Sequence, residues 1–432
     1  MNAKTWAAVV SLAVAGLTAV PAPASAQDAS NLTFRGFVSQ GFLKSSANRW
    51  LDSDTDEGTF AFTEAALNFT AQPVPKVRVA AQLFARDFGT QGNNRVSLDW
   101  GVGEYRAWDQ LGFRIGRVKF PVGLYNTLQD ADVARPEIFQ PSGVYPPERR
   151  DLTNAIDGGG IFGTLQLGGA GYLEYEGLYG TLDLDDSYLL ERATNQLSAA
   201  LLPPLSALRL SNLSYVVSKS EGRAKYAWGG YLEWHPPVSG LRLRGGAQGA
   251  SVDFIATTAY SGFAGTAPVT LSIQSAAHYA VPHQFVFSGE YSRGGLRLTA
   301  EHSRLKNEGT TILSGTPFPA PPPTVTLVYP SSMYGQAAYR FNDHIQASGY
   351  YSVSYADRND KEGNNLVARG QPASGAYVKD LAFTLRVDVN PHWLIKAEFH
   401  DFNGTQNLSA VENPKPLEKD WTLFAVKTTF HF

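Results

Sequence analysis

The 432-residue chain contains no cysteine, two methionines and, beyond its N-terminal stretch, no hydrophobic run long enough for a membrane helix of about 20 residues. The lack of cysteine excludes disulfides, catalytic thiols and thiolate metal sites. A basic excess is also missing, since 36 Lys and Arg stand against 39 Asp and Glu, for a formal net charge of −3. A nucleic-acid partner is therefore not expected.

The N-terminal stretch has the features of a secretory signal peptide. Lys4 supplies the positive charge, Trp6–Val20 is apolar, and Ala24-Ser25-Ala26 is a small-residue cleavage pattern. We therefore expect residues 1–26 to be removed on export, with one structural domain in residues 27–432.

Aromatic residues and glycine are abundant although the chain is not hydrophobic on average. There are 41 Gly, 24 Phe, 20 Tyr and 8 Trp, and the mean hydropathy is −0.20. Strands with one face toward lipid and one toward water produce this combination. The composition indicates an all-β protein with membrane-spanning strands.

Alternation of apolar and polar residues recurs over segments of about ten residues. In the third such segment Val77, Val79 and Leu83 alternate with Arg78 and Gln82, the period of a spanning strand. Sixteen segments of this kind are predicted as strands: Leu32–Leu43, Thr59–Gln72, Lys76–Phe88, Arg95–Trp108, Leu111–Phe120, Asp157–Leu167, Gly171–Leu182, Arg223–Pro236, Leu241–Ile255, Pro282–Tyr291, Leu296–Leu305, Met333–Phe341, Ile345–Tyr355, Tyr377–Val389, His392–Phe402 and Trp421–Phe432.

The connections between these segments alternate in length. Seven are tight turns rich in Gly, Pro, Asn and Asp, such as Asn390-Pro391, and eight are longer polar segments. This asymmetry predicts a transmembrane antiparallel β-barrel of sixteen strands, with short periplasmic turns and long extracellular loops. One of the loops, Tyr188–Leu202, has the apolar spacing of a short helix.

The last segment adds a separate indication. Phe424, Val426, Phe430 and Phe432 share one face of Trp421–Phe432. A terminal aromatic residue on an amphipathic last strand resembles the signal by which outer-membrane proteins are recognised for insertion. The alternative is an ordinary edge strand, which at this length would need pairing or protection. We expect the cell outer membrane as the location.

A closed barrel of sixteen strands leaves an aqueous lumen, which favours passive transport. Extrapolated alternation places more basic than acidic side chains inside, and such rings favour anions. The alternative is that these charges pair across strands. The expected basic residues of the lumen wall are Arg35, Arg78, Arg86, Arg242, Arg244, Arg297, Arg386 and Lys396.

The loop at residues 121–156, after the fifth strand, is long, rich in proline and charged. A change of parity between Ile115 and Val118 predicts a bulge near Gly116-Arg117. The loop is a candidate constriction segment, and the alternative is an external loop without a gating role. The expected constriction residues are Arg114, Arg117, Lys119, Asp130, Asp132, Arg135, Glu137, Glu148, Arg149 and Arg150.

This region carries a family resemblance. The run from Gly116 to Asn126 (GRVKFPVGLYN), with Arg135-Pro136-Glu137-Ile138-Phe139 behind it, resembles Gram-negative outer-membrane porins, among them the phosphate-selective porins. The resemblance implies a sixteen-stranded barrel, an inward-folded loop and a homotrimer. A repeated arginine ladder with a lysine cluster is not evident, so phosphate selectivity is not implied.

The sequence thus predicts a porin, which is a water-filled channel for small hydrophilic solutes, with a preference for anions. We expect the barrel to be embedded in lipid and lipopolysaccharide. A substrate-specific channel, an outer-membrane enzyme and an adhesin without conductance are the alternatives. Catalytic residues, a metal and a cofactor are not expected, because the eight His are scattered singly. An energised receptor is a further alternative that we do not expect, because that class carries a plug domain of over a hundred residues before its barrel and only about five residues separate Gln27 from the first predicted strand.

Overall fold

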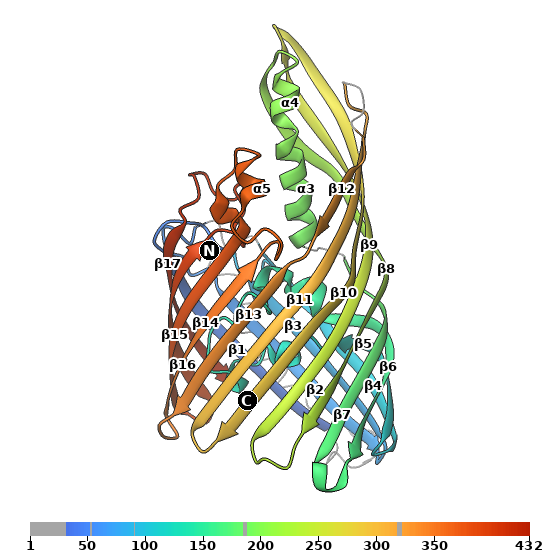
Figure 1. Ribbon diagram of the computed structural model, residues 1–432, viewed down its shortest axis with the longest axis vertical. Coiled ribbons are helices and arrows are strands. Elements are labelled where there is room, and N and C mark those ends of the chain that lie inside the picture. The colour runs from blue at the N-terminus through green and yellow to red at the C-terminus, as the bar shows by residue number, and fades with distance from the viewer. Residues whose placement is uncertain (1–31, 52–53, 90, 185–187, 318–321) are drawn as a thin grey trace, which may run out of the picture.

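The computed structural model describes residues 32–432 except 52–53, 90, 185–187 and 318–321, so the predicted signal peptide lies outside the described residues. All strands belong to one antiparallel sheet that closes on itself (Figure 1). The strands are β1 (Leu32–Ser45), β2 (Thr63–Val74), β3 (Val77–Asp87), β4 (Ser97–Trp108), β5 (Leu111–Lys119), β6 (Ala155–Gln166), β7 (Tyr172–Thr181), β8 (Leu210–His235), β9 (Leu241–Ala264), β10 (Ala267–Arg293), β11 (Leu296–Ser314), β12 (Thr324–Val328), β13 (Ser331–Arg340), β14 (Ile345–Tyr355), β15 (Tyr377–Asn390), β16 (Trp393–Gly404) and β17 (Asp420–His431).

Sixteen of these strands build the barrel, as the sequence predicts. The extra strand, β12, pairs only with the outer part of β11, while the inner part of β11 pairs directly with β13. The short helices are α2 (Arg150–Thr153), α3 (Tyr188–Ala200), α4 (Leu202–Ser206) and α5 (Asn364–Val367), with 3₁₀ turns at Asn126–Leu128, Asp132–Ala134, Pro147–Arg149, Gly168–Ala170 and Ala373–Ala376. The helix predicted at Tyr188–Leu202 is confirmed by α3.

The first and last strands close the barrel. β1 pairs with β17 from Phe37 opposite His431 to Ser45 opposite Leu423. The amide of Gly36 donates to the carbonyl of Phe432 at 3.1 Å, and the amide of Phe432 donates to the carbonyl of Gly36 at 3.0 Å. The closing strand therefore has no bare edge, which resolves the alternative of an ordinary edge strand.

The two faces of the strands follow the predicted alternation. On β3, Gln82, Phe84 and Arg86 are buried inside the barrel, whereas Val79 is 49% exposed on the outer face. On β17, Phe424 and Phe430 are exposed outward. The outer band is apolar, as in barrels that span a membrane, and the period of two fixes which residues reach it.

The bulge predicted near Gly116-Arg117 is wrong. β5 pairs with β4 and with β6 without a register shift at these residues. Gly116 instead has φ of 129°, a conformation that glycine adopts without a Cβ clash. The register shift lies on the neighbouring pair, where Gln82 faces Trp100 but Leu83 faces Leu98.

Three neighbouring strands are much longer than the sequence indicates. β8, β9 and β10 have 26, 24 and 27 residues, whereas about 9–11 residues cross a bilayer. The segment after Ile255, predicted as a loop, is therefore a continuation of the sheet. In Figure 1 these strands rise above the rest of the barrel, with α3 and α4 beside them.

The projecting part has its own small core. Leu205 on α4 packs with Tyr260 on β9 and Ile273 on β10, all three nearly inaccessible to solvent. The opposite face of β10 carries Thr270 and Ser272, which are exposed and polar. A polar outer face suits water, so this part is expected to lie outside the apolar band of the barrel.

Within the described residues no helix combines the length and the apolar character needed to span a membrane.

Candidate functional site

Residues 121–154, between β5 and β6, lie inside the barrel and are called the interior segment below; the last two residues of the predicted loop, 155 and 156, already belong to β6. Hydrogen bonds join the segment to side chains of β10, β11, β13, β15, β16 and β17, the wall across from its own strands. Val122, Leu124 and Tyr145 also belong to a buried apolar cluster with residues of β5–β10. The segment is therefore held on both sides of the lumen.

Glu301 on β11 fixes the start of the interior segment. One carboxylate oxygen accepts from the amide of Leu124 at 2.9 Å, and the other accepts from the hydroxyl of Tyr145 at 2.5 Å. Ser288 and Tyr334 donate to the same carboxylate. Because the side chain is 2% exposed, these four donors replace its water shell.

Glu398 on β16 fixes the middle of the interior segment. Its two oxygens accept from the amides of Ile138 at 2.7 Å and Phe139 at 2.9 Å. Behind it, His400 contacts Glu398 at 2.9 Å and Asp380 at 3.0 Å. A buried carboxylate holding two consecutive amides gives the chain a defined path across the lumen.

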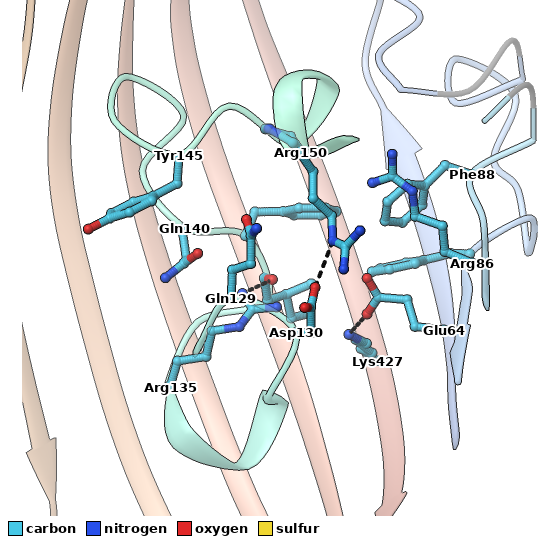
Figure 2. A pocket seen from close by; sticks show the side chains of 14 residues that line it. Glu64, Arg86, Phe88, Gln129, Asp130, Arg135, Gln140, Tyr145, Arg150 and Lys427 are labelled. Carbon is cyan, nitrogen blue, oxygen red and sulfur yellow. Dashed lines mark hydrogen bonds and ion pairs between the residues drawn. The ribbon is translucent and has the colours of Figure 1, made fainter. Parts of the chain in front are cut away.

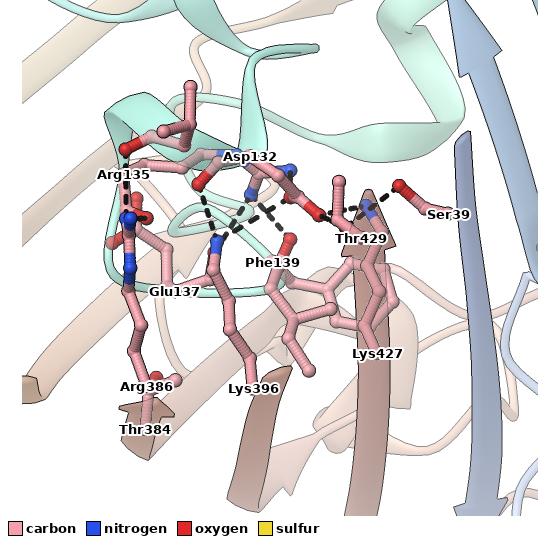
Figure 3. Close-up of polar contacts among 12 residues, drawn as sticks. Ser39, Asp132, Arg135, Glu137, Phe139, Thr384, Arg386, Lys396, Lys427 and Thr429 are labelled. Carbon is pink, nitrogen blue, oxygen red and sulfur yellow. Dashed lines mark hydrogen bonds and ion pairs between the residues drawn. The ribbon is translucent and has the colours of Figure 1, made fainter. Parts of the chain in front are cut away.

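Asp132 is the centre of a third attachment (Figure 3). Its carboxylate lies 2.9 Å from Nζ of Lys427, 3.5 Å from Nζ of Lys396 and 3.3 Å from the guanidinium of Arg135, and it accepts from Thr429 at 2.6 Å. Burial alone would raise the pKa of Asp132, but Lys396, Lys427 and Arg135 together hold that pKa below its usual value.

A fourth attachment joins the interior segment to its own side of the barrel. Asp130 lies 2.5 Å from Nζ of Lys119 and 2.7 Å from Nε of Arg150, and Arg150 also contacts Asp99 on β4 at 2.7 Å. Burial raises the pKa of Asp130, and the charges of Arg150 and Lys119 lower it by more, so the group stays ionised.

The other predicted constriction residues do not form one group, and their contacts differ. Glu137 accepts from Nε2 of Gln336 at 2.9 Å across the lumen. Arg114 pairs with Glu176 at 2.6 Å, and Arg117 pairs with Asp157 at 3.1 Å, outside the Asp130 and Asp132 networks. Arg149 is partly exposed. Burial raises the pKa of Glu148, and its Oε2 has no partner in the described part of the chain.

The predicted lumen-wall residues are mostly neutralised. Three of them bind carboxylates of neighbouring strands: Arg78 with Glu104 at 2.6 Å, Arg242 with Glu290 at 2.9 Å and Arg244 with Glu233 at 2.6 Å. Arg386 donates to the carbonyl of Val133 at 2.8 Å, and Lys396 donates to the carbonyl of Glu137 at 2.9 Å. Arg35 is exposed, Nε of Arg297 has no described partner, and Arg86 is buried. A count of basic residues therefore overstates the free positive charge.

Beside the interior segment a partly open cavity of about 50 Å³ remains (Figure 2). The segment lines one side, and Glu64 of β2 and Arg86 of β3 line the other. Among the fourteen lining residues, four are basic and two are acidic: Arg86, Arg135, Arg150 and Lys427, with Glu64 and Asp130. Basic side chains therefore outnumber carboxylates in this lining, although three of them are ion-paired: Lys427 with Glu64, Arg150 with Asp130 and Arg135 with Asp132.

Several residues that line or surround this cavity were not predicted from the sequence. Gln129 and Gln140 were missed because an uncharged amide in a loop gives no pattern. Phe62, Phe88 and Phe139 form an aromatic group whose ring centroids are 5.0 to 6.5 Å apart. Trp50 of the first loop and Leu408 of the last loop are buried in the same cluster.

One group at the other end of the barrel has the composition of a metal site. Glu174, Glu233 and His235 offer ligand atoms within 4.8 Å of one another. Glu233 is already bound by Arg244 at 2.6 Å, and His235 stacks on Tyr172 with centroids 4.2 Å apart. These contacts give the residues a structural role without an ion.

Known proteins resemble this chain in structure but not detectably in sequence. No protein-family model and no curated protein matches the chain. OmpF of Salmonella typhi, solved in complex with daunomycin, matches with a TM-score of 0.54 over 93% of this chain and 98% of its own, at 12% identity. The chain has a porin-like outer-membrane barrel fold. OmpT, an outer-membrane protein of Vibrio cholerae, matches with a TM-score of 0.50 over 95% of this porin-like chain and all of its own, at 10% identity.

Proposed function

We propose that this porin-like barrel is a diffusion channel for small hydrophilic solutes that prefers anions. The observation that carries the proposal is the positively lined cavity beside the interior segment, in a barrel wide enough to hold water. The lining of this cavity carries four basic side chains and two carboxylates, which favours anions over cations beside the interior segment.

The attachments of the interior segment explain how the lumen is narrowed. Glu301, Glu398 and Asp132 hold the segment from the far wall, so the passage has a fixed cross-section. The same rigidity favours the second candidate, a substrate-specific channel, because a fixed polar aperture can select among solutes by shape and hydrogen bonding.

Planar-bilayer recording tests the proposal. Purified protein should give stepwise ohmic currents, with a reversal potential in a salt gradient that indicates modest anion preference. Absence of any conductance would overturn the channel proposal, whereas cation preference would overturn only the charge argument. An enzyme is the competing class, and we expect purified protein to hydrolyse no ester or peptide substrate.

We also propose that the barrel sits in the outer membrane as a homotrimer, in contact with lipid and lipopolysaccharide. Small outward residues support close packing of neighbours: Ala65 on β2 lies opposite Ala85 on β3, and Ala81 lies opposite Gly101 on β4. Crosslinking in native membranes should give a ladder that ends at three subunits. A ladder that ends at one subunit would contradict the trimer.

A further inference from the structure

Three buried donor atoms around the cavity beside the interior segment have no hydrogen-bond partner among the described residues. They are Nε of Arg135, Nε2 of Gln129 and Nε2 of Gln140. Arg135 is 8% exposed and Gln140 is 7% exposed, so bulk water does not satisfy them. A buried donor left without an acceptor costs about 1–3 kcal/mol, so three in one place call for a guest that accepts hydrogen bonds.

The three donors share the same small space. All three side chains line the cavity, and all come from the interior segment, as Figure 2 shows for the labelled residues. The terminal nitrogens of Arg135 are engaged elsewhere, since they donate to Asp132 at 3.3 Å and to the carbonyl of Glu137 at 3.4 Å. Only Nε of that guanidinium is left for a guest.

Size and charge define what the guest is. A cavity of about 50 Å³ is far smaller than a cavity of roughly 150 Å³ that can hold benzene, and larger than one water requires. The lining has two more positive than negative side chains, and two of its cations, Lys427 and Arg135, also contact Asp132, which lies outside the lining. The unpartnered lining atoms are donors, so a guest that carries acceptor oxygens and a negative charge fits better than a cation.

We propose that this cavity is a binding site for a small carboxylate of one or two carbons, such as formate or acetate. This inference rests on the proposed channel function, because the site would lie on the conduction path. Two oxygens of one carboxylate can accept from two or three N–H groups that converge on it. The bound anion would also replace water that the donors otherwise have to share.

The substitution Gln140→Glu tests the site, because it keeps the shape of the side chain and replaces the donor with a negative acceptor. In planar bilayers the conductance of the unchanged protein should saturate with increasing potassium formate, and Gln140→Glu should shift the half-saturating concentration upward about tenfold. Gln129→Glu provides a second variant in case the first fails to fold. Gln346→Glu, the same change on β14 outside the cavity lining, is the matched control and should leave the half-saturation unchanged.

Calorimetric titration of detergent-solubilised protein with sodium formate separates this inference from the channel proposal. Formate binding that both cavity variants weaken, in a protein without conductance, would support the site and overturn the channel. Conductance that rises linearly with formate, with no heat of binding, would overturn the site and leave the channel standing. In that outcome the three donors are satisfied by water.

Discussion

The charge of Asp132 should hold the interior segment against β16 and β17. Asp132→Asn keeps the shape of the side chain and removes its charge, so Lys396, which is fully buried, loses its carboxylate partner. Removing one member of a buried ion pair costs about 3–5 kcal/mol. Lys427 retains Glu64, and Lys396 retains the carbonyls of Asp132 and Glu137 at 2.9 Å each, so the lower value applies.

A loss of about 3 kcal/mol raises the undocked fraction of the interior segment on the order of a hundredfold, since 1.4 kcal/mol is a factor of ten. The absence of cysteine from the chain makes this fraction measurable. Ile138 is 2% exposed, so the thiol of Ile138→Cys is labelled by a maleimide only when the segment leaves the wall. The labelling rate should rise about a hundredfold when Asp132→Asn is added.

The double substitution Asp132→Asn with Lys396→Met is the control. It removes both charges of the pair, and an apolar replacement of a buried pair is often neutral, so labelling of Ile138→Cys should fall back toward the original rate. Equal labelling rates with and without Asp132→Asn would refute the reasoning, because the segment would then be held without this charge.

Three further predictions concern other parts of the barrel. In Glu301→Gln the new side-chain amide would face two hydrogen-bond donors, such as the amide of Leu124 and the hydroxyl of Ser288, so the start of the interior segment should be held less tightly by about 2–4 kcal/mol. Single-channel current noise should then increase, and unchanged noise would argue against this anchor. The pKa of Asp130 is lowered, so its contribution to docking is complete above about pH 4 and is lost only as the pH falls through the lower folded value. The labelling rate of Ile138→Cys, divided by the rate of a freely exposed thiol at the same pH because only the thiolate reacts, should be constant from about pH 7 to about pH 4.5 and increase below about pH 3. Phe287→Lys on the lipid face of β10 should cost about 2–4 kcal/mol in denaturant unfolding, whereas Ser272→Lys in the projecting part of the same strand should cost nearly nothing; equal losses would place the projecting part in lipid.

Some features of the interior segment could be predicted from the sequence and others could not. Its position after β5 and its charges are visible in the sequence, and Glu301 and Glu398 are inward by alternation. The sequence did not reveal that Asp132 meets Lys427, because the two residues are separated by nearly 300 positions. It also grouped Arg114 and Arg117 with Lys119, although only Lys119 reaches Asp130.

The sequence by itself determined the barrel, its sixteen strands and the inward or outward face of most residues in the predicted strands, because alternation and turn residues act over a few positions. Only the tertiary structure decided where β8–β10 end and what the interior segment touches. The length of β8–β10 depends on their pairing with one another and on the packing of α3 and α4 against them. The attachment of the interior segment depends on charged residues that only the closure of the barrel brings together. The same closure pairs most of the predicted basic residues of the lumen wall with carboxylates or backbone carbonyls, which the sequence alone did not show.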